Sequence, residues 1–134
     1  MAHQFWKASL PLIQITEKHP FLTAMVDGSL SQEKFQYYVL QDALYLTDFA
    51  DCLHRLGKSS TIASNSEKLF ALAKGAEEDE KELHRSFFKT WNIKEEEGSV
   101  KPMPNTVLYT SYMLRVVTTC SHEEGLAVLL PCFW

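Results

Sequence analysis

An acidic side chain lies among aromatic residues in the segment FQYYVLQDALYLTDF, residues 35–49. Tyr38, Asp42, Tyr45 and Phe49 occupy positions i, i+4, i+7 and i+11, so in an α-helix they share one face. Burying a carboxylate is costly unless it is paired or hydrogen-bonded, so Asp42 needs a donor. Two interpretations fit equally well: Asp42 binds the amino group of a ligand, or it forms a structural bond to a neighbouring helix.

A second candidate is Cys132, in the segment LLPCFW at residues 129–134. Pro131 has no backbone N–H and interrupts the helical hydrogen-bond ladder, which can re-aim the side chain that follows it. A thiolate aimed into a cavity is a nucleophile, whereas a lone buried cysteine packs as a small apolar side chain. Cys52 lies in a hydrophobic helix and Cys120, near a helix junction, has no base or cation evident close in sequence, so their claim to catalysis is weaker.

Two further spacings are less specific. Tyr109 and Tyr112, at i and i+3, fit either a hydrophobic core or the wall of a binding site. Asp51-x-x-His54 imitates the spacing found in di-iron helical bundles, but those sites need a second such pair and further carboxylates. We therefore expect no metal site. Neither a phosphate-binding glycine loop nor a serine nucleophile elbow occurs in the sequence.

The composition is that of one globular domain with a small-molecule or protein partner. The 134 residues are 46% hydrophobic and 22% charged, with a net charge of -4 and no dense Lys/Arg cluster. Nucleic-acid and anionic-membrane binding are therefore not expected. The lack of an apolar run of about eighteen residues argues against a membrane span, and the N-terminus lacks the basic region of a secretory signal. Three cysteines at irregular spacing indicate reduced thiols in the cytoplasm.

Apolar residues recur at spacings of three and four without a convincing alternating strand, so the chain is predicted to be all-α. Capping boxes, in which Glu or Gln follows a serine three residues later, are expected to start helices at Ser29, Ser64 and Ser121. Gly57 is expected to end the helix that starts at Ser29. The predicted helices span residues 1–18, with a bend expected at Pro11, then 20–27, 29–57, 64–91, 106–120 and 121–134, with a loop at 92–105.

Four segments of the chain together resemble the TenA family, the thiaminase II or aminopyrimidine aminohydrolase proteins. They are HPFLTAMVDGSLSQEKFQYYVLQDALYLTDFA, ELHRSFF, YTSYMLRV and EGLAVLLPCFW, in the family's order. The resemblance implies an all-helical, haem-oxygenase-like bundle that has no haem or other cofactor and usually assembles as a homotetramer. It also implies thiamine salvage in the cytoplasm, with 4-amino-5-aminomethyl-2-methylpyrimidine as the substrate and thiamine as a poorer one.

The resemblance also implies roles for individual residues. Cys132 matches the family's nucleophile, which attacks the pyrimidine ring so that the group on the 5-methylene can leave. Asp42 matches the carboxylate that hydrogen-bonds the amino and ring nitrogens of the substrate. Tyr45 and Tyr109 match the tyrosines that orient the ring and support the thiol. Two further residues are expected to form walls of the site: Phe49 and Tyr112.

Proteins of the resembled family are longer, and their catalytic glutamate, a further tyrosine and several closing helices follow the PCFW block. We therefore expect residues 1–134 to be the N-terminal portion of a single, incomplete TenA-like domain. The final helix is expected to expose apolar side chains that later helices would cover: Leu129, Leu130, Phe133 and Trp134. Two functions stay open, a cysteine-dependent hydrolase that is inactive as this portion, and a non-catalytic helical module that binds a pyrimidine or another subunit.

Overall fold

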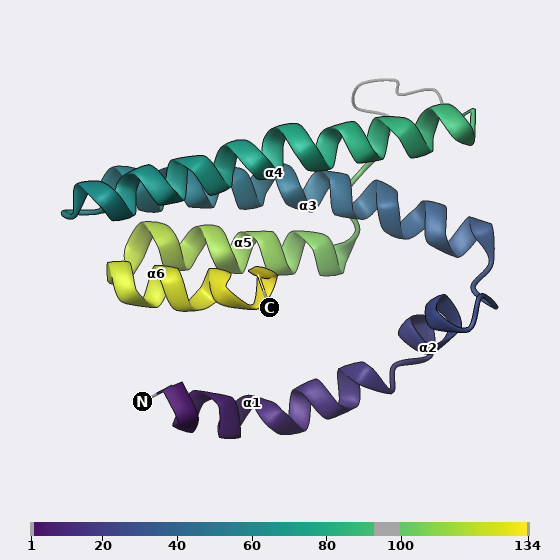
Figure 1. Ribbon diagram of the computed structural model, residues 1–134, viewed down its shortest axis with the longest axis horizontal. Helices are drawn as coiled ribbons and strands as arrows, with labels where there is room; N and C mark the ends of the chain where they lie inside the picture. Colours follow the sequence, from purple (N-terminus) through teal and green to yellow (C-terminus); the bar gives the residue numbers. More distant parts are fainter. Residues whose placement is uncertain (1, 93–99, 134) are drawn as a thin grey trace. The chain divides into compact units, whose positions relative to one another are not determined.

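The computed structural model describes residues 2–92 and 100–133, without the side chains of residues 2, 3, 79–81 and 83. Over these residues every regular element is a helix, which confirms the all-α prediction (Figure 1). The helices are α1 (Ala2–Glu17), α2 (Pro20–Val26), α3 (Gln32–Ser59), α4 (Ala63–Thr90), α5 (Pro104–Thr119), α6 (His122–Leu129) and the 3-10 helix η1 (Leu130–Phe133). Residues 93–99 of the predicted loop lie outside the described residues. None of the described helices is long and apolar enough to cross a membrane.

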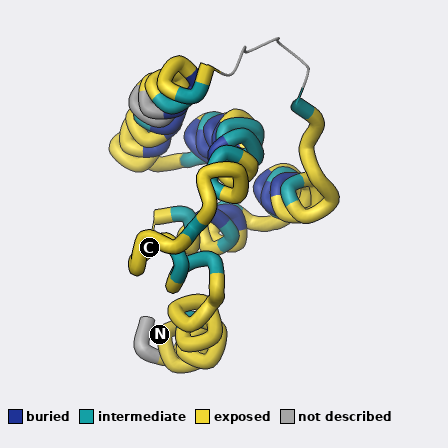
Figure 2. Tube along the Cα trace, turned by 90° about the vertical axis from the view of Figure 1, so that its right-hand side faces the viewer, coloured by how far each residue is buried: buried dark blue, intermediate teal, exposed yellow. Residues whose placement is uncertain are grey.

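The first of two compact units, Met1–Tyr37, contains α1, α2 and the start of α3. α1 keeps Pro11 inside the helix, so the prediction of one helix over this stretch is confirmed. His19 caps α2, because its Nδ1 accepts a hydrogen bond from the backbone N–H of Phe21 at 3.2 Å. Most residues of α1 and α2 are exposed (Figure 2), so these helices bury little apolar surface.

The second unit, Tyr38–Trp134, contains the rest of α3 together with α4, α5, α6 and η1. α3 and α4 run antiparallel, since Asp42 contacts His84 whereas His54, further along α3, contacts Glu77, which lies earlier on α4. α5 and α6 form a second, shorter antiparallel pair (Figure 1). Four helices that alternate in direction can cover one shared core, as in up-and-down bundles.

One hydrophobic core joins the four helices of this unit. α3 contributes half of its residues, through buried side chains spaced three and four residues apart along one helix face. Each fully buried leucine or methionine, such as Leu53 or Met113, contributes about 1.5–3 kcal/mol to stability. The core cluster consists of Leu46, Phe49, Ala50, Cys52, Leu53, Leu56, Leu69, Ala73, Ala76, Met113, Val117 and Leu129.

Two glycines let helices approach closely in this core. A Cβ atom on Gly57 would lie 2.7 Å from the ring of Phe70, and one on Gly125 would lie 2.5 Å from a methyl group of Leu56. The prediction that Gly57 ends α3 is wrong, because the helix continues to Ser59. Gly57 lets Phe70 of α4 pack against α3, and it does not end the helix.

Two of the three predicted capping boxes are wrong. α3 begins after Ser31, whose Oγ accepts a 3.4 Å hydrogen bond from the backbone N–H of Lys34, two residues later than the predicted cap at Ser29. α4 begins after Ile62, which makes no side-chain cap, so the predicted start at Ser64 also fails. A serine three residues before a Glu or Gln is therefore not enough to start a helix when the turn around it makes other hydrogen bonds.

The third capping box and the distortion before Cys132 are confirmed. Ser121 and Glu124 form the reciprocal pair at the start of α6, with hydrogen bonds of 2.9 and 3.2 Å. α6 ends at Leu129, and η1 then carries Pro131 and Cys132 in a tighter turn. The expectation that Leu129 is exposed is wrong, because it is 2% exposed and packs in the core. Two other expected apolar side chains, Leu130 and Phe133, are exposed, and Trp134 lies outside the described residues.

Candidate functional site

An aromatic stack forms where α3, α5 and η1 meet. The ring of Tyr45 on α3 stacks on Phe49 one turn away, at 5.6 Å between centroids, and on Tyr109 of α5, at 5.8 Å. Phe49 is buried, and the centroid of its ring lies 5.3 Å from that of Phe133. Stacked rings at these distances present flat apolar surface to a planar ligand.

Cys132 lies beside this stack. The 3-10 turn of η1 places its Sγ 3.3 Å from the hydroxyl oxygen of Tyr109, and the thiol is half-buried. Burial raises the pKa of both Tyr45 and Tyr109, and their hydrogen bonds with Cys132 raise it further. Both phenols therefore stay protonated at neutral pH, so each can donate to the sulfur and stabilise a thiolate.

Asp42 faces the same region from one turn earlier on α3. Its Oδ2 lies 3.2 Å from His84 Nε2 on α4, so it has the bond to a neighbouring helix that the second interpretation expects. It also borders a hollow of about 330 Å³, as the first interpretation requires. This volume is at the lower end of the range of about 300–1,000 Å³ for small-molecule sites. The hollow is lined by Tyr38, Gln41, Asp42, Tyr45, Asn105, Thr106 and Tyr109.

Gln41 fastens the start of α5 to α3. Its Oε1 accepts hydrogen bonds from the backbone N–H of Met103 at 2.9 Å and from the Thr106 hydroxyl at 2.8 Å. Its Nε2 donates to the backbone carbonyl of Lys101 at 3.2 Å. These bonds hold Tyr109 one turn further along α5 in register with Tyr45. The sequence alone does not predict this role of Gln41. The signal it offers is a polar side chain directly before Asp42 in the segment LQD.

Tyr112 lines a second hollow, of about 380 Å³, together with Asn105, Leu108 and Tyr109. Asn105 and Tyr109 also line the first hollow, so the two hollows adjoin. Asp42, Tyr45 and Tyr109 share the first hollow, and Cys132 and Phe49 contact its tyrosines. The role of Tyr112 as a wall residue stays a prediction.

The other two cysteines are in different surroundings. Cys52 is buried in the core, and burial raises the pKa of its thiol to about 12, so it stays protonated and weakly nucleophilic. Cys120 is exposed, at the end of α5. Among the three, Cys132 is the one that contacts both site tyrosines.

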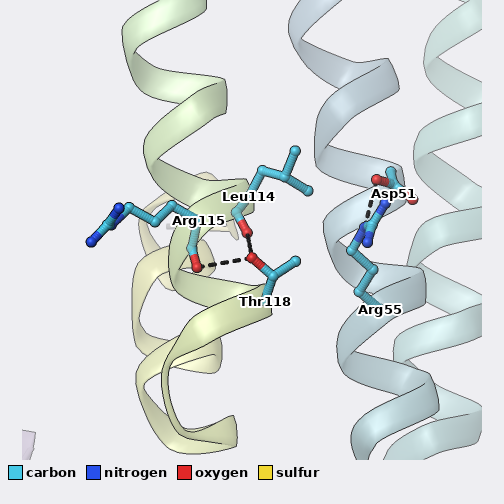
Figure 3. Close-up of polar contacts among 5 residues, drawn as sticks. All are labelled: Asp51, Arg55, Leu114, Arg115 and Thr118. Atoms are coloured by element: carbon cyan, nitrogen blue, oxygen red, sulfur yellow. Dashed lines mark hydrogen bonds and ion pairs between the residues drawn. The ribbon is translucent and has the colours of Figure 1, made fainter.

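The two side chains of the pattern Asp51-x-x-His54 contact other residues instead of each other. Asp51 Oδ2 accepts a 2.7 Å ion-paired hydrogen bond from Arg55 Nε one turn along α3, which Figure 3 shows. His54 Nε2 lies 3.4 Å from Glu77 Oε1 of α4. The described part of the chain holds no group of three side chains suited to a metal ion.

Comparisons with known proteins agree with this arrangement. Residues 6–134 match the family model described as the TENA/THI-4/PQQC family. The chain is 37% identical over 134 residues to the aminopyrimidine aminohydrolase of Bacillus subtilis (strain 168), covering 99% of this chain and 54% of that protein. It is 34% identical over 138 residues to the aminopyrimidine aminohydrolase of Halalkalibacterium halodurans, covering 99% of this chain and 60% of that protein.

Solved structures support the same fold. A TenA homologue protein from P. horikoshii OT3 superposes with a TM-score of 0.90 at 28% sequence identity, over 99% of this chain and 62% of that one. The expected TenA-like fold is thus confirmed. The chain spans 54% and 60% of the length of the two curated relatives named above.

Proposed function

Because the chain belongs to the TENA/THI-4/PQQC family, we propose that residues 1–134 supply the cysteine and the pyrimidine site of a thiamine-salvage hydrolase, which acts on 4-amino-5-aminomethyl-2-methylpyrimidine and, more slowly, on thiamine. Relatives named aminopyrimidine aminohydrolase support this substrate class. The observation that carries the proposal is the 3.3 Å contact between Cys132 and the Tyr109 hydroxyl, beside a hollow that Asp42 borders.

The hollow suits the flat ring and amino edge of an aminopyrimidine. The ring stacks on Tyr45 and Tyr109, whose faces are apolar and whose hydroxyls point to polar partners. The carboxylate of Asp42 accepts hydrogen bonds from the exocyclic amino group and a protonated ring nitrogen, which are strong because one partner is charged. The ring of Phe49 packs against Tyr45 and supports the stack.

Cys132 supplies covalent catalysis. Its thiolate forms an S–C bond to an electron-poor ring carbon, and the ring electrons then expel the amine from the 5-methylene as the C–N bond breaks. The departing amine takes up a proton and leaves as ammonia. Water adds at the methylene with loss of a proton, the S–C bond breaks, and the thiolate returns. With thiamine, the thiazole leaves in place of ammonia.

A second candidate function is binding without turnover, by a helical module that holds a pyrimidine or another subunit. Several exposed apolar side chains on α5, α6 and η1 favour it, since large apolar patches mark interaction surfaces. They are Leu108, Tyr112, Leu126, Leu130 and Phe133.

The resemblance also supports a homotetramer, and the three free cysteines fit the cytoplasm.

One experiment separates the two functions. The purified chain is titrated with the aminopyrimidine in a calorimeter, and the same samples are analysed for ammonia and the hydroxymethyl product by mass spectrometry. Binding with product formation supports the hydrolase. Binding without product contradicts hydrolysis by residues 1–134 and leaves pyrimidine binding as the function of this portion, and the absence of both contradicts the proposed substrate. Light scattering after size-exclusion chromatography measures the oligomeric state.

A further inference from the structure

His84 is a buried polar side chain for which the sequence indicates no role. Its side chain is 6% exposed, whereas that of Asp42, its partner on α3, is 25% exposed. The imidazole ring stacks on Phe88 one turn along α4, at 6.3 Å between centroids and 17° between planes. His84 does not line the hollow that Asp42 borders, so any effect on a ligand there passes through Asp42.

The surroundings of the ring indicate where its proton lies. Nε2 is 3.2 Å from Asp42 Oδ2, whereas Nδ1 is buried and has no hydrogen-bond partner in the described part of the chain. A carboxylate oxygen only accepts hydrogen bonds, so this geometry places a proton on Nε2, and Nε2–H donates to Asp42 Oδ2.

We propose that His84 is a positioning residue, which holds the Asp42 carboxylate in the orientation that recognises the amino-bearing edge of the pyrimidine. This inference rests on the proposed function. An aspartate on a helix face can turn about two side-chain bonds, and a donor fixed on α4 restricts that motion before the ligand arrives. A group that is already ordered loses less entropy on binding, so the ligand binds more tightly.

The test uses two amide side chains that differ in reach. The amide nitrogen of His84→Gln can occupy the place of Nε2 and donate to Asp42, whereas that of His84→Asn stops near the place of Nδ1. Calorimetry with the aminopyrimidine should show His84→Gln binding as the wild-type chain does and His84→Asn binding about ten- to a hundredfold more weakly. His54→Gln and His54→Asn are the matched controls, and both should bind normally.

A second readout separates positioning from mere stability. The preference for the aminopyrimidine over an analogue without the 4-amino group should fall in His84→Asn but not in His84→Gln. Circular dichroism checks the fold of each variant. Nitrogen NMR of the wild-type imidazoles reads the tautomer without any substitution, so it tests the proposal even if His84→Asn does not fold.

The outcomes distinguish this inference from the proposed function. Equal affinity and equal selectivity of the two His84 variants, or a His84 ring without a proton on Nε2, would overturn the positioning role and leave the proposed function standing. A wild-type chain that binds no aminopyrimidine would overturn both.

Discussion

Two histidine–carboxylate pairs join α3 to α4. Their members on α3, Asp42 and His54, lie about 18 Å apart along the helix, because an α-helix rises about 1.5 Å per residue. The pair His84–Asp42 has an N···O distance of 3.2 Å and the pair His54–Glu77 one of 3.4 Å, so their geometry is similar. Their exposure differs, because the His84 side chain is 6% exposed whereas that of His54 is 37% exposed. Water screens the second pair more than the first, in which the His84 side chain is buried and the Asp42 side chain is 25% exposed.

The neighbours of the two pairs differ as well. Asp42 borders a hollow shared with Tyr45 and Tyr109, with Cys132 in contact with both tyrosines. The ring of His54 instead lies against Phe70, in a region where helices pack closely. The same residue types therefore lie beside a hollow in one place and at a more exposed contact between helices in the other, and under the proposed function the first pair takes part in recognition.

The largest expected effect in this comparison comes from removing the charge at the hollow. Asp42→Asn should weaken aminopyrimidine binding by about 1.5–3 kcal/mol, because a hydrogen bond with a charged partner is lost. Isothermal titration calorimetry measures the change. Glu77→Gln removes the corresponding charge from the exposed pair and should leave affinity unchanged. If both variants bind equally well, the distinction between the two regions fails.

A smaller effect, on stability alone, is expected where the helices pack closely. Gly125→Ala places a Cβ atom 2.5 Å from Leu56, which is fully buried and has no room to move. Overpacking of this kind costs about 1–3 kcal/mol, which urea denaturation measures as a lower free energy of unfolding. Gly57→Ala is the control, since the ring of Phe70 is partly exposed and can turn away. A Gly125→Ala variant as stable as wild type would contradict the packing account.

The smallest effect is expected at the exposed pair. His54→Gln should change the free energy of unfolding by less than about 1 kcal/mol, because water and salt screen an interaction this exposed. Thermal or urea unfolding at low and high salt measures it, and any difference should shrink at high salt. A clear loss of aminopyrimidine affinity in this variant would remove the contrast with His84.

Local patterns in the sequence predict where the helices are, but they do not predict which helices pack against each other. The spacing of Tyr38, Asp42, Tyr45 and Phe49 correctly places them on one face of α3, because helical periodicity depends only on residues close in sequence. The partner of Asp42 is a residue 42 positions later, His84, and no local spacing indicates which helix packs opposite. Family resemblance singled out Cys132 and Tyr109, whose contact depends on the turn between α5 and α6.

Two of the errors, at Gly57 and Leu129, have the same origin. Gly57 looks like a helix end, but Phe70 packs against it and the helix continues. Leu129 looks exposed at the end of an apolar segment, yet it is buried in the core that α3, α4 and α5 form. In each case a contact with a distant residue decides the outcome, and a pattern of neighbours in sequence does not contain that contact.

The proposed function depends on Cys132 acting as a nucleophile beside Tyr45 and Tyr109. The most direct test compares Cys132→Ser with Cys120→Ser, which alters an exposed thiol outside the site, in an assay of ammonia release from the aminopyrimidine. Cys132→Ser should lose about a thousandfold or more in kcat while keeping its circular dichroism spectrum, and Cys120→Ser should retain wild-type turnover. Near-normal turnover by a folded Cys132→Ser variant would contradict the account.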